Sequence, residues 1–332
     1  MKTAECVTPG HPDKMCDRIS DAVLDWALKN DPKARVAIEV LGGHGRIFIC
    51  GELTMLNMPS DDDLQLTLVE IVQGVTGRTD LQLDWNIVKQ SPEIANGVDT
   101  GGAGDQGIMV GYACDDNEAM IPEELFLARS LAKFLYEKFP FDGKTQVTLD
   151  NNNDVITIVA SFQNVDKATL EESVNEWVEK DGIYCTPDVN IYANPAGDWK
   201  QGGFDADTGL TGRKLMVDNY GPQVAIGGGC FSGKDASKVD RSAAYMARRI
   251  AVDLLKEHKA HNVTVKLAYA IGVAEPVMAT ACVDIGSCTN DIEIKGYDLT
   301  PKGIREFLKL DSPQYEETAK WGHFGNGFVW DK

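Results

Sequence analysis

One order of elements, a helix, a β-hairpin and a second helix, recurs three times along the 332 residues of this chain. The first helices of the three sets are predicted to begin near residues 12, 122 and 237. The spacing is therefore about 110 and then about 115 residues, and a period of this kind is typical of repeated structural units. We expect an α+β fold of three pseudo-repeated α/β domains at residues 1–115, 116–225 and 226–332, with C-terminal segments packing back onto the first.

Local patterns support this recurrence. Met15, Ile19, Val23 and Ala27 recur every four residues, which is the apolar stripe of a helix that faces a core. The glycine-rich run 42–45 separates two β-rich segments, as in a hairpin. The elements expected on this basis are helices at 12–28, 61–75, 122–139, 167–178, 237–258 and 301–310, and strands at 36–41, 46–50, 145–149, 155–162, 263–270 and 276–283.

Composition excludes several classes of protein. Lys and Arg number 32 and Asp and Glu 51, so the formal net charge is −19. We expect no nucleic-acid or membrane partner, because binding to a polyanionic surface needs a basic footprint. No apolar run is long enough to span a membrane, and the first residues lack the apolar stretch of a signal peptide, so a cytoplasmic protein is expected. The eight cysteines are scattered without a C-x-x-C pair, which disfavours a zinc site or a disulfide framework.

Basic residues gather in one region of this acidic chain. Five cations stand within 29 residues, and two groups of them directly follow glycines. In such a place side chains and backbone N–H groups can converge on one anion, so the sequence favours a polyphosphate ligand over a solvated charged face. The cations are Arg213, Lys214, Lys234, Lys238 and Arg241.

Residues 228–234 also fit the pattern G-x-x-x-x-G-K, which is the start of a P-loop. Asp235 follows, at the place where a P-loop has the Ser or Thr that ligates magnesium. A P-loop kinase or ATPase therefore stays open as an alternative, weakened by this mismatch and by the α+β recurrence.

Two other segments are candidates for ligand contacts. Residues 10–14 begin a predicted helix, where unpaired N–H groups favour an anion. His11 and Lys14 are candidates to contact a phosphate there and Asp13 to hold its metal ion, although proline and an acidic residue also simply suit a helix start. The glycine-rich run 101–107 lets the backbone approach a ligand or form part of a lid, but a plain glycine-rich turn is the more common explanation.

Four carboxylates stand in strand or loop contexts, namely Glu39, Glu52, Asp142 and Asp207. A charged group in an apolar strand is costly to bury without a partner. Beside a polyphosphate, these groups are candidates to hold metal ions or a substrate ammonium group. For the two strand residues, simple exposure to solvent is the alternative.

Taken together, these segments resemble the S-adenosylmethionine synthetase family, also called methionine adenosyltransferase. The resemblance implies three pseudo-repeated α+β domains and a homodimer, or a tetramer of two dimers, with active sites between subunits. It also implies that methionine sulfur attacks the 5′ carbon of ATP, and that the expelled triphosphate is cleaved to pyrophosphate and phosphate. The matching segments lie in the family's order and are 10–14, 102–107, 209–214, 227–235, 237–245, 269–276 and 322–325.

The resemblance assigns roles to the charged residues. His11 would stabilise the departing triphosphate oxygen, with help from a set of cations. Asp13 and Asp240 would hold two Mg²⁺ ions per site, and Glu39 the activating K⁺. The cations of the catalytic set are Lys144, Arg213, Lys214, Lys234 and Lys238.

The substrates ATP and L-methionine would contact a second set of residues. Glu52, Gln90 and Asp105 would bind methionine, with Asp207 near both substrates. Trp199 would stack against adenine. Asp142, which precedes the cation Lys144, and Cys230, which stands in the glycine-rich nonapeptide, complete the substrate-binding set.

Three departures from the family pattern stand out. The segment 91–101 is several residues shorter than the usual bacterial lid, Trp199 replaces Phe beside Asp198, and Cys230 replaces Ala. No residue for the triphosphate or the metals is lost, so we expect catalysis to survive. The alternative from another class is a nucleotide-binding regulatory protein that has lost turnover through its short lid.

Overall fold

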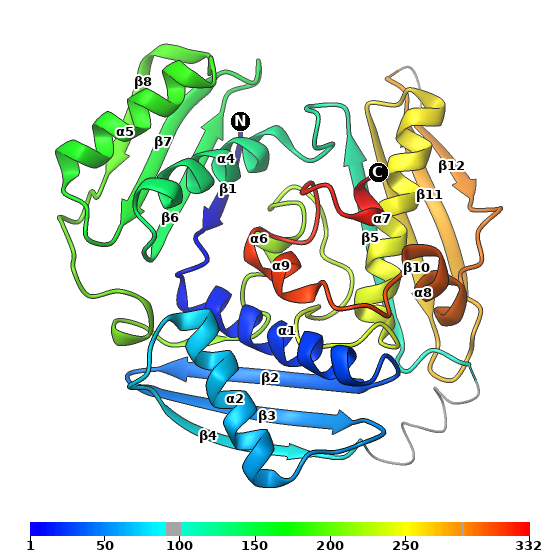
Figure 1. Ribbon diagram of the computed structural model, residues 1–332. Helices are drawn as coiled ribbons and strands as arrows, with labels where there is room; N and C mark the ends of the chain where they lie inside the picture. The colour runs from blue at the N-terminus through cyan, green and yellow to red at the C-terminus, as the bar shows by residue number, and fades with distance from the viewer. Residues whose placement is uncertain (91–100, 287–288) are drawn as a thin grey trace.

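The computed structural model describes residues 1–90, 101–286 and 289–332, and in these ranges it contains three four-stranded sheets (Figure 1). One sheet has the order β4-β3-β2-β9, with β2 (Arg35–Gly43), β3 (Arg46–Thr54), β4 (Gln82–Val88) and β9 (Gly209–Leu210). A second has the order β1-β6-β7-β8, with β1 (Lys2–Val7), β6 (Gly143–Leu149), β7 (Val155–Phe162) and β8 (Cys185–Ala193). The third has the order β12-β11-β10-β5, with β5 (Gly107–Cys114), β10 (Asn262–Tyr269), β11 (Met278–Asp284) and β12 (Thr289–Glu293).

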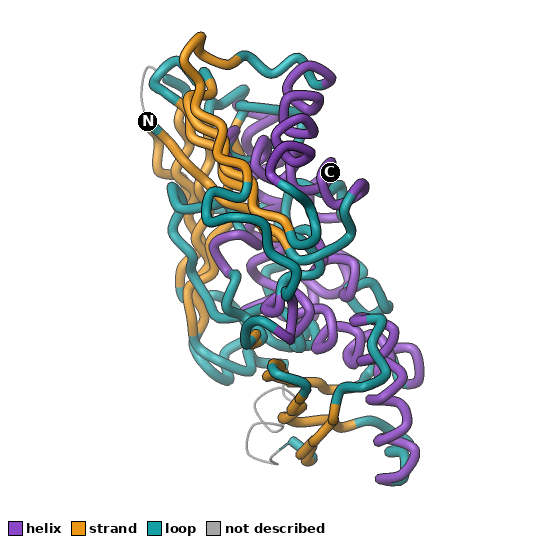
Figure 2. Tube along the Cα trace, turned by 90° about the vertical axis from the view of Figure 1, so that its left-hand side faces the viewer, coloured by secondary structure: helices purple, strands orange, loops and turns teal. Residues whose placement is uncertain are grey.

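Helices cover one face of each sheet. Figure 2 shows the strands along one side of the molecule and the helices along the other. The helices are α1 (Pro12–Asn30) and α2 (Asp61–Thr76) on the first sheet, α4 (Glu123–Lys138) and α5 (Lys167–Lys180) on the second, and α7 (Val239–His258) and α8 (Pro301–Leu308) on the third. The expected α+β fold of three similar units is confirmed.

Each of the three sheets contains one strand from a distant part of the chain. β1 pairs with β6, β5 pairs with β10, and β9 pairs with β2, all antiparallel. Each of these three strands joins a hairpin that is distant in sequence, and this crossing ties the units together. The boundaries at 115 and 225 remain predictions, because the sheets draw strands from across them.

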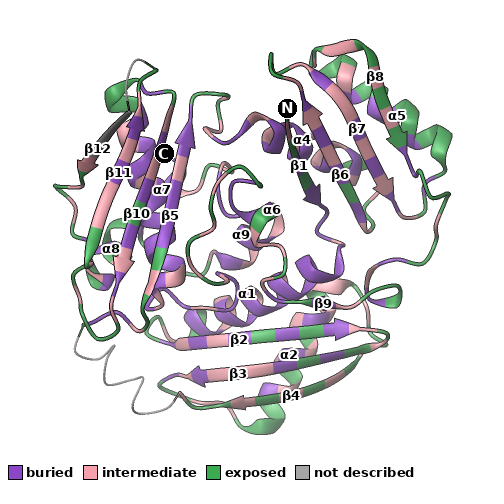
Figure 3. Ribbon diagram, turned by 180° about the vertical axis from the view of Figure 1, so that it is seen from behind, coloured by how far each residue is buried: buried purple, intermediate pink, exposed green. Residues whose placement is uncertain are grey.

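Helix α1 lies at the centre, between the first sheet and the short helix α9 (Tyr315–Lys320) (Figure 3). Its apolar stripe is buried as expected, since Ile19 and Val23 have no exposed surface. The return of α9 onto α1 brings the C-terminal segment back to the first unit. The chain ends with the 3₁₀ turn Val329–Asp331, in which Trp330 is buried.

The expected helices and hairpins form within a few residues of their predicted bounds. Helix α7 begins at Val239 rather than 237, because the Asp235 carboxylate accepts a hydrogen bond from the N–H of Ser237 at 2.8 Å and holds that segment in a turn. No helix in the described ranges has both the length and the apolar content that crossing a membrane requires.

Candidate active site

The N-terminus of α1 presents His11 and Asp13. The Nδ1 atom of His11 accepts a hydrogen bond from the N–H of Asp13 at 3.1 Å and caps the helix. Burial, together with the charges of Lys214 and Lys144, lowers the pKa of His11 to about 3. The ring is therefore neutral at pH 7, and with Nδ1 acting as acceptor its proton resides on Nε2. Nε2–H is thus the group that His11 offers to a ligand oxygen.

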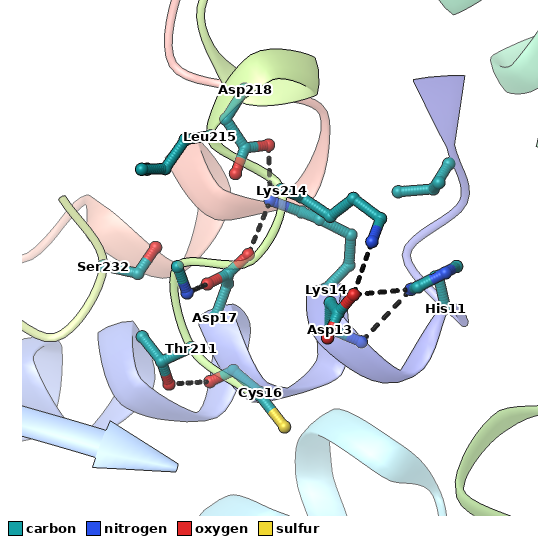
Figure 4. A network of polar contacts seen from close by, with 12 residues as sticks. His11, Asp13, Lys14, Cys16, Asp17, Thr211, Lys214, Leu215, Asp218 and Ser232 are labelled. Carbon is teal, nitrogen blue, oxygen red and sulfur yellow. Dashed lines mark hydrogen bonds and ion pairs between the residues drawn. The ribbon is translucent and has the colours of Figure 1, made fainter. Parts of the chain in front are cut away.

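Asp13 joins this helix end to the loop 209–214. Its Oδ1 accepts a hydrogen bond from the N–H of Leu210 at 3.0 Å and lies 3.4 Å from Nε of Arg213, while its Oδ2 pairs with Lys214 (Figure 4). Burial acts to raise the pKa of Asp13, but the hydrogen bonds from Lys214 and Leu210 hold it below its usual range. The carboxylate is therefore ionised and surrounded by donors.

Lys144 and Asp207 complete the surroundings of His11. Lys144 stands exposed on β6, and the charges of Lys144 and Asp207 both act on the imidazole. Asp142, just before that strand, accepts a hydrogen bond from the N–H of Gly203 at 2.9 Å. The structure therefore brings together what we call the α1 group: His11, Asp13, Asp142, Lys144, Asp207, Arg213 and Lys214.

Lys234 and Asp240 form the centre of a second set, which we call the α7 group. Lys234 Nζ lies 2.5 Å from Asp240 Oδ2, and the N–H of Gly229 donates to Asp240 Oδ1 at 3.2 Å. Desolvation raises the pKa of Glu39 on β2, and the charge of Lys234 opposes this shift. The members are Glu39, Cys230, Lys234, Asp235, Lys238 and Asp240, with Lys238 paired to Asp235.

The two groups meet where the backbone of Gly212 packs against the side chain of Cys230, and not through ion pairs. In the described residues, no hydrogen bond or ion pair joins a side chain of one group to a side chain of the other. Gly212, at φ +82°, packs against Cys230, and a Cβ on it would lie 2.7 Å from the Cβ of Cys230. The loop 209–214 and the loop 227–235 therefore lie back to back.

The remaining candidates lie outside these two groups. Glu52 is on β3 and Gln90 just follows β4, where its N–H donates to the hydroxyl of Thr54 at 3.2 Å. Asp105 is exposed two residues before β5. Trp199 is half-buried, and its Nε1 donates to Asn194 at 3.4 Å. Most of the short lid segment, residues 91–100, lies outside the described residues.

Two sequence interpretations are wrong. Lys14 does not face an anion site: it is buried, and its Nζ donates to Asp17 at 3.1 Å and to Asp218 at 2.6 Å. The run 228–234 is not a P-loop, since residues 219–238 form no strand or helix beyond one β-bridge between Ala37 and Lys234. A P-loop needs a strand before the glycines and a helix directly after the lysine.

The carboxylates suit metal ions that arrive with a phosphate ligand. Within the described ranges, no three His, Cys, Asp or Glu side chains gather into a metal cage. Mg²⁺ is usually held by one or two carboxylates together with substrate phosphates. Asp13 and Asp240, each an isolated carboxylate beside a lysine, fit that pattern.

Sequence reasoning missed the buried carboxylates behind the site. Asp17 and Asp21 lie on α1 and are 1% and 0% exposed. Asp17 accepts from Gly212, and Asp21 pairs with Arg241, so both touch the site loops from behind. The signal was present as a four-residue spacing of aspartates, offset by two residues from the apolar stripe and therefore on the opposite face of the helix.

Comparisons with known proteins find the same family along the whole chain. The models of S-adenosylmethionine synthetase match it in three consecutive parts: the N-terminal domain at residues 1–96, the central domain at 100–199 and the C-terminal domain at 201–332. The S-adenosylmethionine synthase of Bifidobacterium adolescentis is 39% identical over 383 aligned positions, and that of Helicobacter pylori is 42% identical over 372. Each alignment covers 99% of this chain and 95% of the relative.

A solved structure supports the same assignment. The structure described as an unusual S-adenosylmethionine synthetase from Campylobacter jejuni superposes with a TM-score of 0.88 at 30% identity, covering 100% of this chain and 96% of that one. Both sequence alignments are longer than this chain's 332 residues, so these relatives contain segments that it lacks. On the three domain models, the full-length relatives and the shared fold, the chain belongs to the S-adenosylmethionine synthetase family.

Proposed function

We propose that this chain is a methionine adenosyltransferase that forms S-adenosylmethionine from ATP and L-methionine and then hydrolyses the triphosphate to pyrophosphate and phosphate. The observation that carries the proposal is the gathering of cations at two glycine-rich loops of a chain with net charge −19. A leaving triphosphate gains negative charge as the bond from its oxygen to C5′ breaks. Cations fixed in advance around that oxygen stabilise this charge without reorganisation.

The catalytic set acts on the triphosphate. The neutral His11 donates its Nε2–H to the departing oxygen, because its Nδ1 is occupied by the helix cap. Arg213 and Lys214 sit beside it, and Lys234 and Lys238 contribute from the α7 group. Lys144 adds a further charge from β6. No general base is needed for the first step, since a thioether sulfur is already a nucleophile, so orientation and electrostatics supply the acceleration.

The substrate-binding set positions methionine and adenosine. Carboxylates suit the methionine ammonium group, and we assign Glu52 and Asp105 to it, with Gln90 as a hydrogen-bonding partner. Trp199 offers a ring for adenine, while Asp142 and Asp207 lie near the triphosphate end. Cys230 contributes to substrate binding by holding its loop in place, since its side chain packs on Gly212.

Bound metal ions neutralise phosphate oxygens. Asp13 and Asp240 would each hold one Mg²⁺, and Glu39 would hold K⁺. Both aspartates are paired with lysines in this structure, so binding of a nucleotide with its metals would require these residues to exchange partners.

We further propose a homodimer, or a tetramer of two dimers, with active sites between subunits. The outer sheet faces support this, since they carry exposed apolar rows. Phe48, Leu41 and Leu210 are exposed and stand opposite one another across β3, β2 and β9. Ile108 and Met278 flank Ala268 in the third sheet, beside a groove of about 610 Å³ that reaches Gly227 of the α7 group loop. Adjoining exposed apolar side chains of this kind are typical of interaction sites.

The test is incubation of the purified protein with ATP, L-methionine, Mg²⁺ and K⁺. S-adenosylmethionine is quantified by mass spectrometry, alongside phosphate and pyrophosphate. We expect one of each per turnover. ATP binding without any product would instead support the nucleotide-binding regulator and would overturn the proposal.

A further inference from the structure

Helix α1 carries a line of aspartates with a four-residue spacing, namely Asp13, Asp17, Asp21 and Asp25. Such a spacing places side chains above one another on one helix face. Each of the four carboxylates accepts hydrogen bonds from backbone N–H groups of another segment, as the bonds to Leu210, Gly212, Gly233 and residues 314–316 show. The line therefore fixes distant loops to one rigid helix.

The two middle members bond the residues that directly precede site cations. Asp17 Oδ1 accepts from the N–H of Gly212 at 2.7 Å, and Arg213 follows. Asp21 Oδ1 accepts from the N–H of Gly233 at 2.8 Å, and Lys234 follows. Both glycines have positive φ, +82° and +81°, in loops without regular structure at these points. Backbone bonds to β2 hold the neighbouring groups, as between the Thr211 N–H and the Val40 carbonyl at 3.0 Å and between the Ile38 N–H and the Gly233 carbonyl at 3.0 Å. The N–H groups of the two glycines themselves are bound by the carboxylates.

Each of these carboxylates is itself held by buried cations. Asp17 accepts from Lys14 at 3.1 Å, and Lys14 also pairs with Asp218 (Figure 4). Asp21 binds Arg241 through two bonds of 2.7 Å, and Arg241 in turn donates to the carbonyl of Lys234 at 2.9 Å. The side chains of Lys14, Asp17, Asp21 and Arg241 are at most 1% exposed. Solvent therefore does not compete for these bonds.

From this arrangement we infer that Asp17 and Asp21 are positioning residues for the reaction, which fix the backbone before Arg213 and Lys234 so that these cations meet the departing triphosphate. The inference rests on the proposed function. The inference extends that function by assigning a role to two buried residues outside the substrate-binding set. A displacement of about 1 Å at a reacting group can lower a rate on the order of 10²-fold, so the loss of one such bond is measurable.

The primary variant is Asp17→Ala, because Lys14 keeps Asp218 as its partner. We expect the KM for ATP to rise and kcat to fall, together by on the order of 10- to 100-fold, while the KM for methionine stays within about twofold. Asp17→Asn keeps an acceptor oxygen at the same reach and restores part of the loss. Thr211→Val is a second route to the same loop, since the Thr211 hydroxyl contacts Ser20 at 2.6 Å and accepts from the N–H of Val40 at 2.9 Å.

The matched control is Asp25→Ala in the same line. Within the part of the chain that the structure describes, Asp25 bonds the start of α9 and no site loop. We expect this variant to melt at a lower temperature with an unchanged KM for ATP. A KM shift as large as that of Asp17→Ala would mean general loosening of α1 and would overturn the inference. The inference would also be overturned if folded Asp17→Ala kept the wild-type kcat and KM values. If Asp17→Ala does not fold, wild-type values for Thr211→Val would overturn it instead. Lys214→Ala, measured alongside, separates the two claims: if it keeps full activity, the proposed site itself fails.

Discussion

The ammonium nitrogen of Lys234 lies 2.5 Å from Oδ2 of Asp240. One residue is assigned to the triphosphate and the other to Mg²⁺, and in this structure each neutralises the other. An acidic chain can in this way keep a cation and a metal-binding carboxylate at one place without a net charge. On the proposed function, ATP with Mg²⁺ would draw the lysine to phosphate and the carboxylate to the metal.

The first prediction concerns this lysine. Replacement of one charged donor to a developing oxyanion costs on the order of 10²- to 10³-fold in kcat, so Lys234→Ala should show a loss of this size in S-adenosylmethionine formation. Lys295→Ala is the control, because Lys295 is exposed and pairs with the equally exposed Glu293. Equal rates for the two variants would remove Lys234 from the catalytic set.

The second prediction concerns the metal. Loss of even an outer partner of a metal ligand costs about 10- to 100-fold in metal affinity. Asp240→Asn should therefore raise the Mg²⁺ concentration for half-maximal activity by at least about tenfold. Asp253→Asn, which alters the contacts of Asp253 with Arg249 and with the Tyr297 hydroxyl, should leave it unchanged. An unaltered Mg²⁺ titration of Asp240→Asn would contradict the assignment.

The third prediction concerns the dependence of stability on pH. His323 is buried, and its Nδ1 lies 2.8 Å from the hydroxyl of Tyr245. Burial, aided by the charges of Arg241, Lys14 and Arg129, lowers the pKa of His323 well below its usual range. Below about pH 6.5 this imidazole binds a proton in the unfolded chain but not in the folded one. The free energy of unfolding therefore falls as the pH falls.

This contribution is isolated by His323→Asn, which keeps a polar atom near Nδ1. Between pH 7.5 and 5.5 the free energy of unfolding of the wild type should decrease by about 1.4 kcal/mol more than that of the variant. The comparison cancels carboxylates with raised pKa values, such as Asp218 at about 6, which act in the opposite direction. Urea unfolding at the two pH values measures it, and parallel curves would show that His323 titrates normally.

The fourth prediction concerns the contact between the two site loops. Gly212→Ala adds a Cβ that meets Cys230, at a φ of +82°. Gly45→Ala meets nothing within 4 Å at a φ of +80° and carries only the backbone strain. The first should be less stable than the second by about 1–3 kcal/mol and should lose activity. Similar stability and activity for both would show that the loops do not need this close packing.

The fifth prediction concerns the active site between subunits. Lys214→Ala damages the α1 group and Lys234→Ala the α7 group. If each site combines one group from each subunit, then mixing the two inactive variants under subunit exchange restores about a quarter of the activity. A mixture of Lys214→Ala with Lys144→Ala, both in the α1 group, restores none. No recovery in the first mixture would place both groups of a site in the same subunit.

Local sequence patterns were enough to predict most helices and the central hairpins. The stripe that includes Ile19 and Val23 and the glycines at 42–45 act over a few residues, and α1 and the β2–β3 hairpin form where they indicate. β1, β5 and β9 were not expected. Each is a partner of a strand far away in the chain, and no local period encodes such pairing.

The part of the site that could be predicted is the part formed by charged residues in recognisable sequence patterns. The clustering of Lys and Arg at glycines pointed to a polyphosphate, and the family resemblance gave the roles. Lys14 was misassigned because the local sequence of a helix start does not show whether its lysine faces solvent or two buried carboxylates. Asp17 and Asp21 were passed over because a row of aspartates opposite the apolar stripe is typical of a solvent-facing helix side. Their burial follows only from the loops that pack on that side.

The central claim is that the carbon–oxygen bond at C5′ of ATP breaks. ATP labelled with ¹⁸O in the atom between C5′ and the α-phosphorus tests it directly. Turnover with L-methionine, followed by mass spectrometry, should place all of the label in the phosphate and pyrophosphate and none in the adenosyl product. Label retained on the nucleoside would mean cleavage at phosphorus and would contradict the account.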